Sequence, residues 1–232
     1  MSLLNITTTK TFNTNELGND YFVGDIHGQY SLLIEQLKNA DFNFKTDRLF
    51  AVGDIIDRGS ESEKCLELLI EPWFNSVLGN HEQLFLQGFS NASFWKVLVD
   101  NGGDWINNWL NNPSKLLAWA HLIRIKMPLS FTVKNNSGTI GVIHADAPAN
   151  WSELEDLEIT EQSVIPLIWY RRNLIEPSGT TINNIDAVVH GHNSLESFAV
   201  INNQIWIDTL QKTNALTILQ NSEIFDLIKG KN

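Results

Sequence analysis

Three short apolar segments in the first ninety residues each end in a glycine followed by an acidic or amide side chain. They read YFVGD (21–25), LFAVGD (49–54) and SVLGN (76–80). A segment with helical periodicity follows each of them, at 31–40, 60–70 and 82–89. Three successive strand–loop–helix units predict a parallel sheet, with the loops at the carboxyl ends of its strands lying together.

The ends of the predicted helices carry capping signals. Ser31 is placed as an N-cap for the first helix, and Ser60 with Glu63 forms a capping-box pattern before the second. The segment 91–128 is also helical in period, and it holds four tryptophans that we expect to pack mainly in the core: Trp95, Trp105, Trp109 and Trp119. Of these, Trp105 and Trp109 are spaced to share a helix face.

The remainder of the chain favours β-strands. Hairpins are predicted at 129–146, 198–209 and 215–228, the last turning at Asn221-Ser222, with a helix at 161–175 and a strand at 186–193 between the first two. No Pro/Gly/Ser-rich linker divides the sequence, which indicates one domain over residues 1–232. The predicted class is α/β (α+β), with two mixed sheets face to face and helices outside.

Composition excludes several classes of function. The net charge of −11 and the pI of about 4.9 disfavour binding to nucleic acid or to anionic membranes. No apolar run approaches the roughly 20 residues of a membrane span, and the N-terminus lacks the pattern of a signal peptide. The single cysteine, Cys65, allows no intramolecular disulfide. We therefore expect a soluble, cytoplasmic protein.

Five predicted strands end in side chains that are typical metal ligands. One such end is usually incidental, but five in one chain, mostly beside glycine, are not readily explained by local hydrogen bonding. Four of the six histidines fall at these positions. The residues are Asp25, His27, Asp54, Asn80, His81, His144 and His192.

The chemistry of these ligands narrows the metal. Imidazole, carboxylate and amide oxygen without a thiolate suit manganese, iron or zinc better than calcium, magnesium or an iron–sulfur cluster. The set is too large for one tetrahedral ion, so two divalent ions are expected. Two divalent ions carry four positive charges, and the carboxylates of Asp25 and Asp54 offset two of them. The remaining positive charge suits a bound phosphate and a hydroxide. Arg58, four residues beyond Asp54, is a candidate phosphate clamp, as is one of the neighbours Arg171 and Arg172.

The motifs GDIHG, GDIIDRG, GNHE, HAD and GHN, in this order over roughly residues 20 to 220, resemble those of calcineurin-like metallophosphoesterases. Within that superfamily the chain is most similar to the serine/threonine protein phosphatases of phages and bacteria. The resemblance implies direct attack of a metal-held hydroxide on phosphorus, without a phosphoenzyme. The metal ligands it implies are Asp25 and His27 for the first ion, Asp54 for both, and Asn80, His144 and His192 for the second.

The resemblance also assigns the residues that handle the phosphate. His81 protonates the leaving oxygen and Asp57 orients it, while Arg58, Arg171 and Asn80 bind the phosphate oxygens. The implied reaction is manganese-dependent hydrolysis of a phosphorylated protein or peptide. His190, two residues before His192, stands where the family usually has an apolar strand residue. It is expected to be a satisfied strand-end histidine, with an extra polar contact near the second metal as the alternative.

Two other functions remain open at this stage. Hydrolases of diadenosine tetraphosphate share several motifs, but the DRG after GDII and the GNHE motif favour the protein phosphatases. A metal-binding interaction module without catalysis would have lost ligands or the acid, and every position is filled here. The sequence does not fix the oligomeric state, the physiological substrate, the preference among serine, threonine and tyrosine phosphates, or the native metal.

Overall fold

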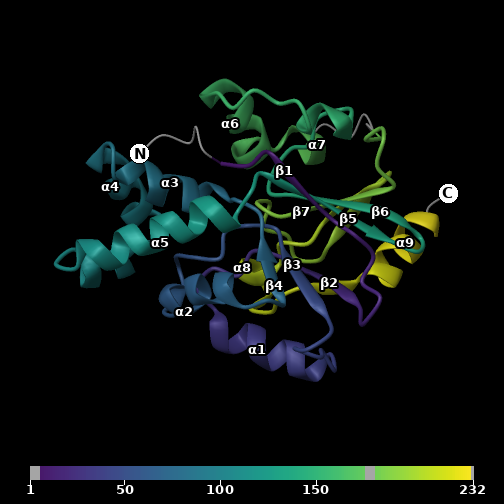
Figure 1. Cartoon of the computed structure of the whole chain (residues 1–232), viewed down its shortest axis with the longest axis horizontal. Helices are drawn as coiled ribbons and strands as arrows, with labels where there is room; N and C mark the ends of the chain where they lie inside the picture. The colour runs from purple at the N-terminus through teal and green to yellow at the C-terminus, as the bar shows by residue number, and fades with distance from the viewer. Residues whose placement is uncertain (1–5, 176–180, 231–232) are drawn as a thin grey trace.

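The computed structural model describes residues 6–175 and 181–230, which form two β-sheets packed face to face between helices (Figure 1). The four-stranded sheet has the order β10-β2-β3-β4, and the six-stranded sheet has the order β1-β5-β6-β7-β9-β8. The predicted class, two mixed sheets with flanking helices, is confirmed. The strands are β1 (Thr9–Phe12), β2 (Asp20–Val23), β3 (Arg48–Ala51), β4 (Phe74–Ser76), β5 (Ser130–Asn135), β6 (Gly138–Ile143), β7 (Ala187–His190), β8 (Ala199–Ile201), β9 (Gln204–Trp206) and β10 (Ile218–Gln220).

The four-stranded sheet contains the three strand–loop–helix units. Strands β2, β3 and β4 run parallel, and β10 pairs antiparallel with β2. All four residues of β2 are buried. Three of them, Tyr21, Phe22 and Val23, are consecutive and apolar, as expected for a strand in a sheet covered on both faces. The predicted parallel arrangement is therefore confirmed.

The six-stranded sheet is built around the predicted hairpins. Strands β5 and β6 pair antiparallel from Ser130↔Ile143 to Asn135↔Gly138, and β8 pairs antiparallel with β9. Strands β6, β7 and β9 run parallel, with His190 of β7 opposite Trp206 of β9. The carboxyl ends of these three strands therefore lie at one edge of the sheet.

Apolar side chains fill the space between the two sheets. Phe22 and Phe50 come from the four-stranded sheet, and Phe131 and Val142 from the six-stranded sheet. All four are fully buried, and the Phe50 and Phe131 rings lie 5.8 Å apart, edge to face. The core thus joins the sheets and holds their strand ends in fixed positions.

Helices cover the outer faces and the left-hand side of the molecule in Figure 1. Helices α1 and α2 lie below the four-stranded sheet, α3 to α5 lie at the left, and α6 and α7 lie above (Figure 1). The α-helices are α1 (Tyr30–Asn39), α2 (Ser62–Glu67), α3 (Asn80–Gly88), α4 (Ala92–Asp100), α5 (Pro113–Lys126), α6 (Glu161–Trp169), α7 (Arg172–Ile175), α8 (Leu210–Thr213) and α9 (Asn221–Lys229). Three 3₁₀ helices complete the set: η1 (Leu68–Ile70), η2 (Asp104–Trp109) and η3 (Trp151–Leu154).

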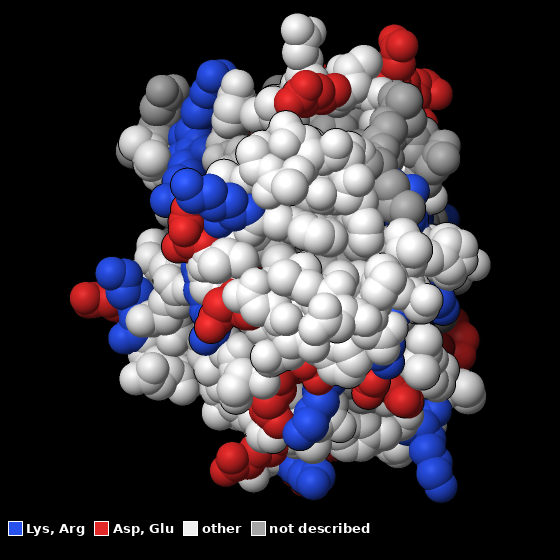
Figure 2. Space-filling model, turned by 90° about the vertical axis from the view of Figure 1, so that its left-hand side faces the viewer, with Lys and Arg blue, Asp and Glu red and all other residues white. Residues whose placement is uncertain are grey.

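The tryptophan-rich segment 91–128 forms α4, η2 and α5, as predicted. Trp105 and Trp119 are buried, and Trp105 and Trp109 both contact Trp119, with ring centroids 5.6 and 5.0 Å apart. The side of the molecule that holds α4 and α5 carries few charged side chains across its centre (Figure 2). In the parts of the chain that the structure describes, no helix combines the length and the apolar character needed to span a membrane.

Three local predictions are wrong. The expected turn at Asn221-Ser222 is the start of α9, because Glu223 accepts a hydrogen bond from the backbone N–H of Gln220 and completes a capping box there. Ser31 is not an N-cap but lies inside α1, where its backbone N–H and its hydroxyl both donate to Glu61.

The predicted capping box before the second helix is also absent. Helix α2 begins at Ser62, with Glu61 as its N-cap, so Ser60 lies outside the helix. Glu63 instead accepts a hydrogen bond from Nε1 of Trp109. A long-range contact thus replaces the local one that the sequence pattern indicates.

Candidate metal centre

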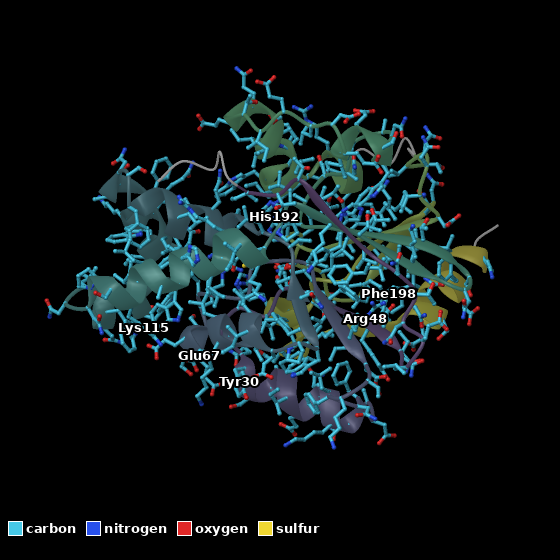
Figure 3. The ribbon with its side chains drawn as sticks, in the orientation of Figure 1. Tyr30, Arg48, Glu67, Lys115, His192 and Phe198 are labelled. Carbon is cyan, nitrogen blue, oxygen red and sulfur yellow. The ribbon has the colours of Figure 1, made fainter. Side chains whose placement is uncertain are left out.

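The predicted ligand residues come together where the strands of both sheets end. Asp25, Asp54 and Asn80 follow β2, β3 and β4, and His144 and His192 follow β6 and β7. In the view of Figure 3, His192 lies near the middle of the molecule, away from its rim. A cavity of about 500 Å³ opens over this place, and it is lined by Asp25, Asp54, Arg58, Asn80, His81, Asn101, Trp169, Arg171, His192, Ser194, Gln211 and Lys212.

Asp54 is shared by two groups of side chains of the types that bind metal ions. One nitrogen or oxygen atom from each of His27, Asp54 and His81 lies within 4.8 Å of the others, and the same holds for Asp54, His144 and His192. Nε2 of His144 is 3.4 Å from Oδ2 of Asp54. One carboxylate shared by two ligand groups is the arrangement needed to bridge two metal ions.

The other predicted ligands complete these two groups. Oδ2 of Asp25 lies 3.9 Å from Nε2 of His27, on one side of Asp54. Oδ1 of Asn80 lies 3.0 Å from Nε2 of His144, on the other side. The structure therefore brings together all six residues that the sequence indicates as ligands.

Backbone carbonyls orient the histidine rings. Nδ1 of His27 lies 3.0 Å from the carbonyl oxygen of Ile56, and Nδ1 of His144 lies 2.8 Å from that of Val52. A ring nitrogen that donates to a carbonyl fixes the tautomer and leaves the lone pair on the other nitrogen, here Nε2. Nε2 of His192 is 3.1 Å from the carbonyl oxygen of Trp169, so its lone pair is on Nδ1.

Several residues of the site have left-handed backbone conformations. Among the described residues, nine other than glycine have positive φ, and five of them are predicted site residues. Such conformations cost free energy and persist where the surrounding structure enforces them, which is common at functional sites. The five are His27, Asp54, Asp57, Arg58 and His192, with φ between 44° and 72°.

At three of the six predicted ligands, His27, His192 and Asp54, burial and charge favour the protonation state that binds metal. Burial lowers the pKa of His27 and of His192 to about 3, so both rings are neutral near pH 7. Burial raises the pKa of Asp54, but the neighbouring His144 and His81 outweigh this effect and hold the pKa well below its usual value. Neutral imidazoles and an ionised carboxylate are the forms that coordinate a metal ion.

His81 forms a hydrogen-bonded dyad with Asp57. Nδ1 of His81 lies 2.6 Å from Oδ2 of Asp57, and both side chains are buried. Burial lowers the pKa of His81, but the Asp54 and Asp57 carboxylates outweigh it and raise the pKa above its usual value. His81 is thus arranged to hold a proton on the ring atom that faces Asp54.

The structure adds a third member to this dyad. Nε1 of Trp105 donates to Oδ1 of Asp57 at 2.6 Å, so each oxygen of the carboxylate has one strong partner. Trp105 is buried, as its sequence context predicts, but nothing in the sequence indicates this contact. Forty-eight positions separate the two residues, and no local pattern joins them.

Glu82 is a second residue whose role at the site the sequence analysis missed. Its carboxylate is fully buried and accepts hydrogen bonds from four backbone N–H groups in two of the loops that carry ligands. Oε1 accepts from Ile55 and Ile56, and Oε2 accepts from Asp54 and Gly79. The glutamate of the GNHE motif thus holds the loop after β3 against the loop after β4.

The arginines separate into two groups. Arg58 and Arg171 line the cavity, whereas Arg172 lies outside its lining and stacks on the Tyr170 ring, 4.4 Å from its centroid. Arg171, not Arg172, is therefore the member of the pair that faces the site. Nη1 of Arg58 donates to Nε2 of His27 at 2.6 Å, and the side-chain amide of Gln211 also faces this guanidinium.

His190 is a structural residue, as expected. It is fully buried, Nδ1 lies 2.7 Å from the carbonyl oxygen of Ala145, and its ring stacks on Trp206 with centroids 4.7 Å apart. The ring therefore packs within the six-stranded sheet, where β7 pairs with β9.

Taken together, the donor set fits two divalent ions: imidazole, carboxylate and amide oxygen converge in two groups around one shared carboxylate. Such a centre, beside two cavity-lining arginines, is that of a metal-dependent hydrolase of phosphate esters. A sequence model of the calcineurin-like phosphoesterases matches residues 21–195. The chain belongs to this family.

Individual relatives agree with this assignment. The chain is 34% identical to serine/threonine-protein phosphatase 2 of Escherichia coli (strain K12), over 88% of its own length and 92% of that protein. It is also 34% identical to a symmetrical bis(5'-nucleosyl)-tetraphosphatase of Shewanella frigidimarina (strain NCIMB 400), but over only 56% of its length and 46% of that protein.

Solved structures share the fold at lower identity. A protein serine/threonine phosphatase from Saccharomyces cerevisiae, with similarity to human phosphatase PP5, superimposes with a TM-score of 0.62 at 13% identity. The match covers 88% of this chain and 71% of that one. At this identity the match supports the fold alone.

Proposed function

We propose that this enzyme is a protein serine/threonine phosphatase that uses two divalent ions, with manganese as the native metal. The relatives named as protein phosphatases support the substrate class, because the match to the Escherichia coli protein spans nearly all of both chains. Imidazole, carboxylate and amide ligands support manganese, with iron and zinc as the other candidates.

In this proposal the six converging residues hold the metal ions. When bound, the two ions would supply a nucleophile from water at neutral pH and offset the charge of the phosphate. Around Asp54, Asp25 and His27 serve the first ion, and Asn80, His144 and His192 serve the second. The carbonyls behind His27 and His144 support these roles, because they direct Nε2 of each ring towards Asp54.

The single observation that carries the proposal is the dyad of His81 and Asp57 beside the shared carboxylate. Nε2 of His81 lies 3.9 Å from Oδ2 of Asp54, on the side of the ring opposite Asp57. A proton held there can pass to the leaving oxygen of a serine or threonine phosphate, which is a poor leaving group. Loss of this proton donor is expected to reduce the rate at least about 10²-fold.

Cations and an amide complete the phosphate site. Arg58 and Arg171 would each hold phosphate oxygens, since a guanidinium presents two parallel N–H donors. Asn80, which also lines the cavity, would contribute its amide to the same phosphate. Neither arginine forms an ion pair with a carboxylate among the described residues, so no carboxylate offsets either positive charge.

A phosphoserine peptide and diadenosine tetraphosphate, assayed side by side with added manganese, test the proposal. Asp54→Asn is the control, because it removes the shared carboxylate while keeping the size of the side chain. We expect metal-dependent hydrolysis of the peptide and little of the dinucleotide. A threonine and a tyrosine phosphopeptide of the same sequence define the preference among phosphorylated residues.

The opposite outcomes separate the alternatives. Hydrolysis of the dinucleotide alone would assign the chain to the other branch of the family, as the partial match to the Shewanella protein allows. No turnover of either substrate would favour a metal-binding interaction module. Within the proposal the substrate is a phosphoprotein or phosphopeptide, and the setting is the reducing cytoplasm, which suits the single buried thiol of Cys65.

A further inference from the structure

A sixth strand also ends in an acidic side chain at the metal centre. Asp208 follows β9, which runs parallel to β7 with Trp206 opposite His190. Asp208 therefore lies two residues past Trp206, just as His192 lies two residues past His190. The strand-end rule that identified the other ligands applies equally to this residue, although the sequence analysis did not assign it a role.

The carboxylate of Asp208 is buried and only half satisfied. The residue is 1% exposed, and Oδ2 accepts a hydrogen bond from the hydroxyl of Ser194 at 2.8 Å. Oδ1 is inaccessible to solvent and has no hydrogen-bond partner among the described residues. A buried carboxylate oxygen without a partner is costly, so a structure retains it where something else compensates the charge.

The neighbours of Asp208 compensate its charge only in part. Burial, followed by Asp208, raises the pKa of Asp25 well above its usual value. Burial and then Asp54 raise the pKa of Asp208, although Ser194, His144 and Arg58 act in the opposite direction. Three buried carboxylates thus repel one another around a single place. Ser194, the hydrogen-bond donor to Asp208, lines the same cavity as Asp25.

We propose that Asp208 supplies the third carboxylate of the metal centre and strengthens binding of the ion held by Asp25 and His27. Oδ1 is the atom available to that ion or to a water on it. This inference rests on the metal centre of the proposed function and adds a residue to it. Two divalent ions carry four positive charges. Asp25 and Asp54 reduce the net charge of the centre to two, and Asp208 reduces it to one.

The proposal predicts opposite effects on metal binding and on the stability of the metal-free protein. Asp208→Asn keeps an oxygen for Ser194 but removes a repulsive charge, so the metal-free variant should melt at the wild-type temperature or above it. The affinity for one of two Mn²⁺ ions should fall by about 10-fold to 100-fold, as for other residues that support a metal site.

A buried carboxylate away from the site gives the matched control. Asp47 is 6% exposed and accepts hydrogen bonds from the backbone N–H groups of Asn19 and Asn43. Asp47→Asn should lower the melting temperature with and without metal and leave the affinity for Mn²⁺ unchanged. Titration calorimetry on protein stripped with a chelator, together with thermal unfolding, provides both readouts without any assay of turnover.

The outcomes are distinct from a failure of the proposed function. If the wild-type protein does not bind two Mn²⁺ ions, the metal centre itself is wrong, and this inference is wrong with it. If the wild-type protein binds two ions and Asp208→Asn does so with equal affinity, only the role of Asp208 is refuted. Should that variant not fold without metal, Asp208→Ala replaces it, and failure of both to fold would show a structural carboxylate and overturn the proposal.

Discussion

Glu82 offers a direct test of how the loops of the site are held together. Its two carboxylate oxygens accept four backbone N–H groups, two at each oxygen. In Glu82→Gln the amide oxygen can keep two of these bonds, while the NH₂ group faces the other two donors. Two buried N–H groups then lack an acceptor, at about 1–3 kcal/mol each, so the variant should lose about 4 kcal/mol of unfolding free energy.

Urea unfolding of the metal-free protein measures this loss. The experiment belongs at pH 8, where the Glu82 carboxyl, whose pKa burial raises to about 7, is ionised. The control is Glu61→Gln, at a carboxylate near the surface that bonds Ser31 and Lys64, and its effect should stay below about 1 kcal/mol. A loss below about 1 kcal/mol for Glu82→Gln, with an unchanged denaturant dependence, would refute this account of the loops.

Three further predictions concern residues around the site. Arg171→Ala should lower kcat/KM on a phosphopeptide by roughly 10-fold to 100-fold, because it removes charged hydrogen bonds to phosphate. Arg172→Ala should change kcat/KM by less than about twofold. Equal losses would contradict the assignment of Arg171 to the phosphate site. Burial lowers the pKa of His190 from 6.5 to about 4. As the pH falls from 6.5 to about 4, the unfolded state therefore binds a proton that the folded state does not. The free energy of unfolding should decrease by about 3 kcal/mol over this pH range. Unfolding of His190→Gln should lack that part of the pH dependence, and an unchanged profile would show that the ring titrates normally. Trp105→Phe should slow hydrolysis of phosphoserine much more than that of p-nitrophenyl phosphate, whose leaving group needs no proton; equal effects would indicate a purely structural role.

The sequence predicted the sheets and the ligand set because both depend on short-range patterns. An apolar strand that ends in glycine and a polar side chain can be recognised within eight residues, as at Asp25 and Asp54. Parallel pairing then brings such ends together without further information. The segment that ends at Asp208 is also an apolar strand followed by a polar side chain, but it lacks the glycine. The burial of its carboxylate and the unpaired Oδ1, which only the structure shows, are what suggest a role for Asp208 at the site.

The remaining features of the site depend on contacts between distant segments. Trp105 and Asp57 are brought together by the packing of η2, and no pattern near either residue indicates it. The error at Ser31 has the same origin, because Glu61, thirty positions away, takes the hydroxyl that a local cap would use. In contrast, α9 was missed although Gln220 and Glu223 form a recognisable capping box.

The contact between Arg58 and His27 has a consequence for the order of binding events. In this structure the guanidinium donates to the lone pair of Nε2 that an incoming cation would need. In the proposed centre His27 binds a metal through Nε2, so metal uptake would displace Arg58 and free its side chain to bind a phosphate. Metal and phosphate would then each increase the affinity for the other, since thermodynamic coupling between two ligands is reciprocal. Under the proposed function, Arg58 would complete the anion site only after the metal ions have bound.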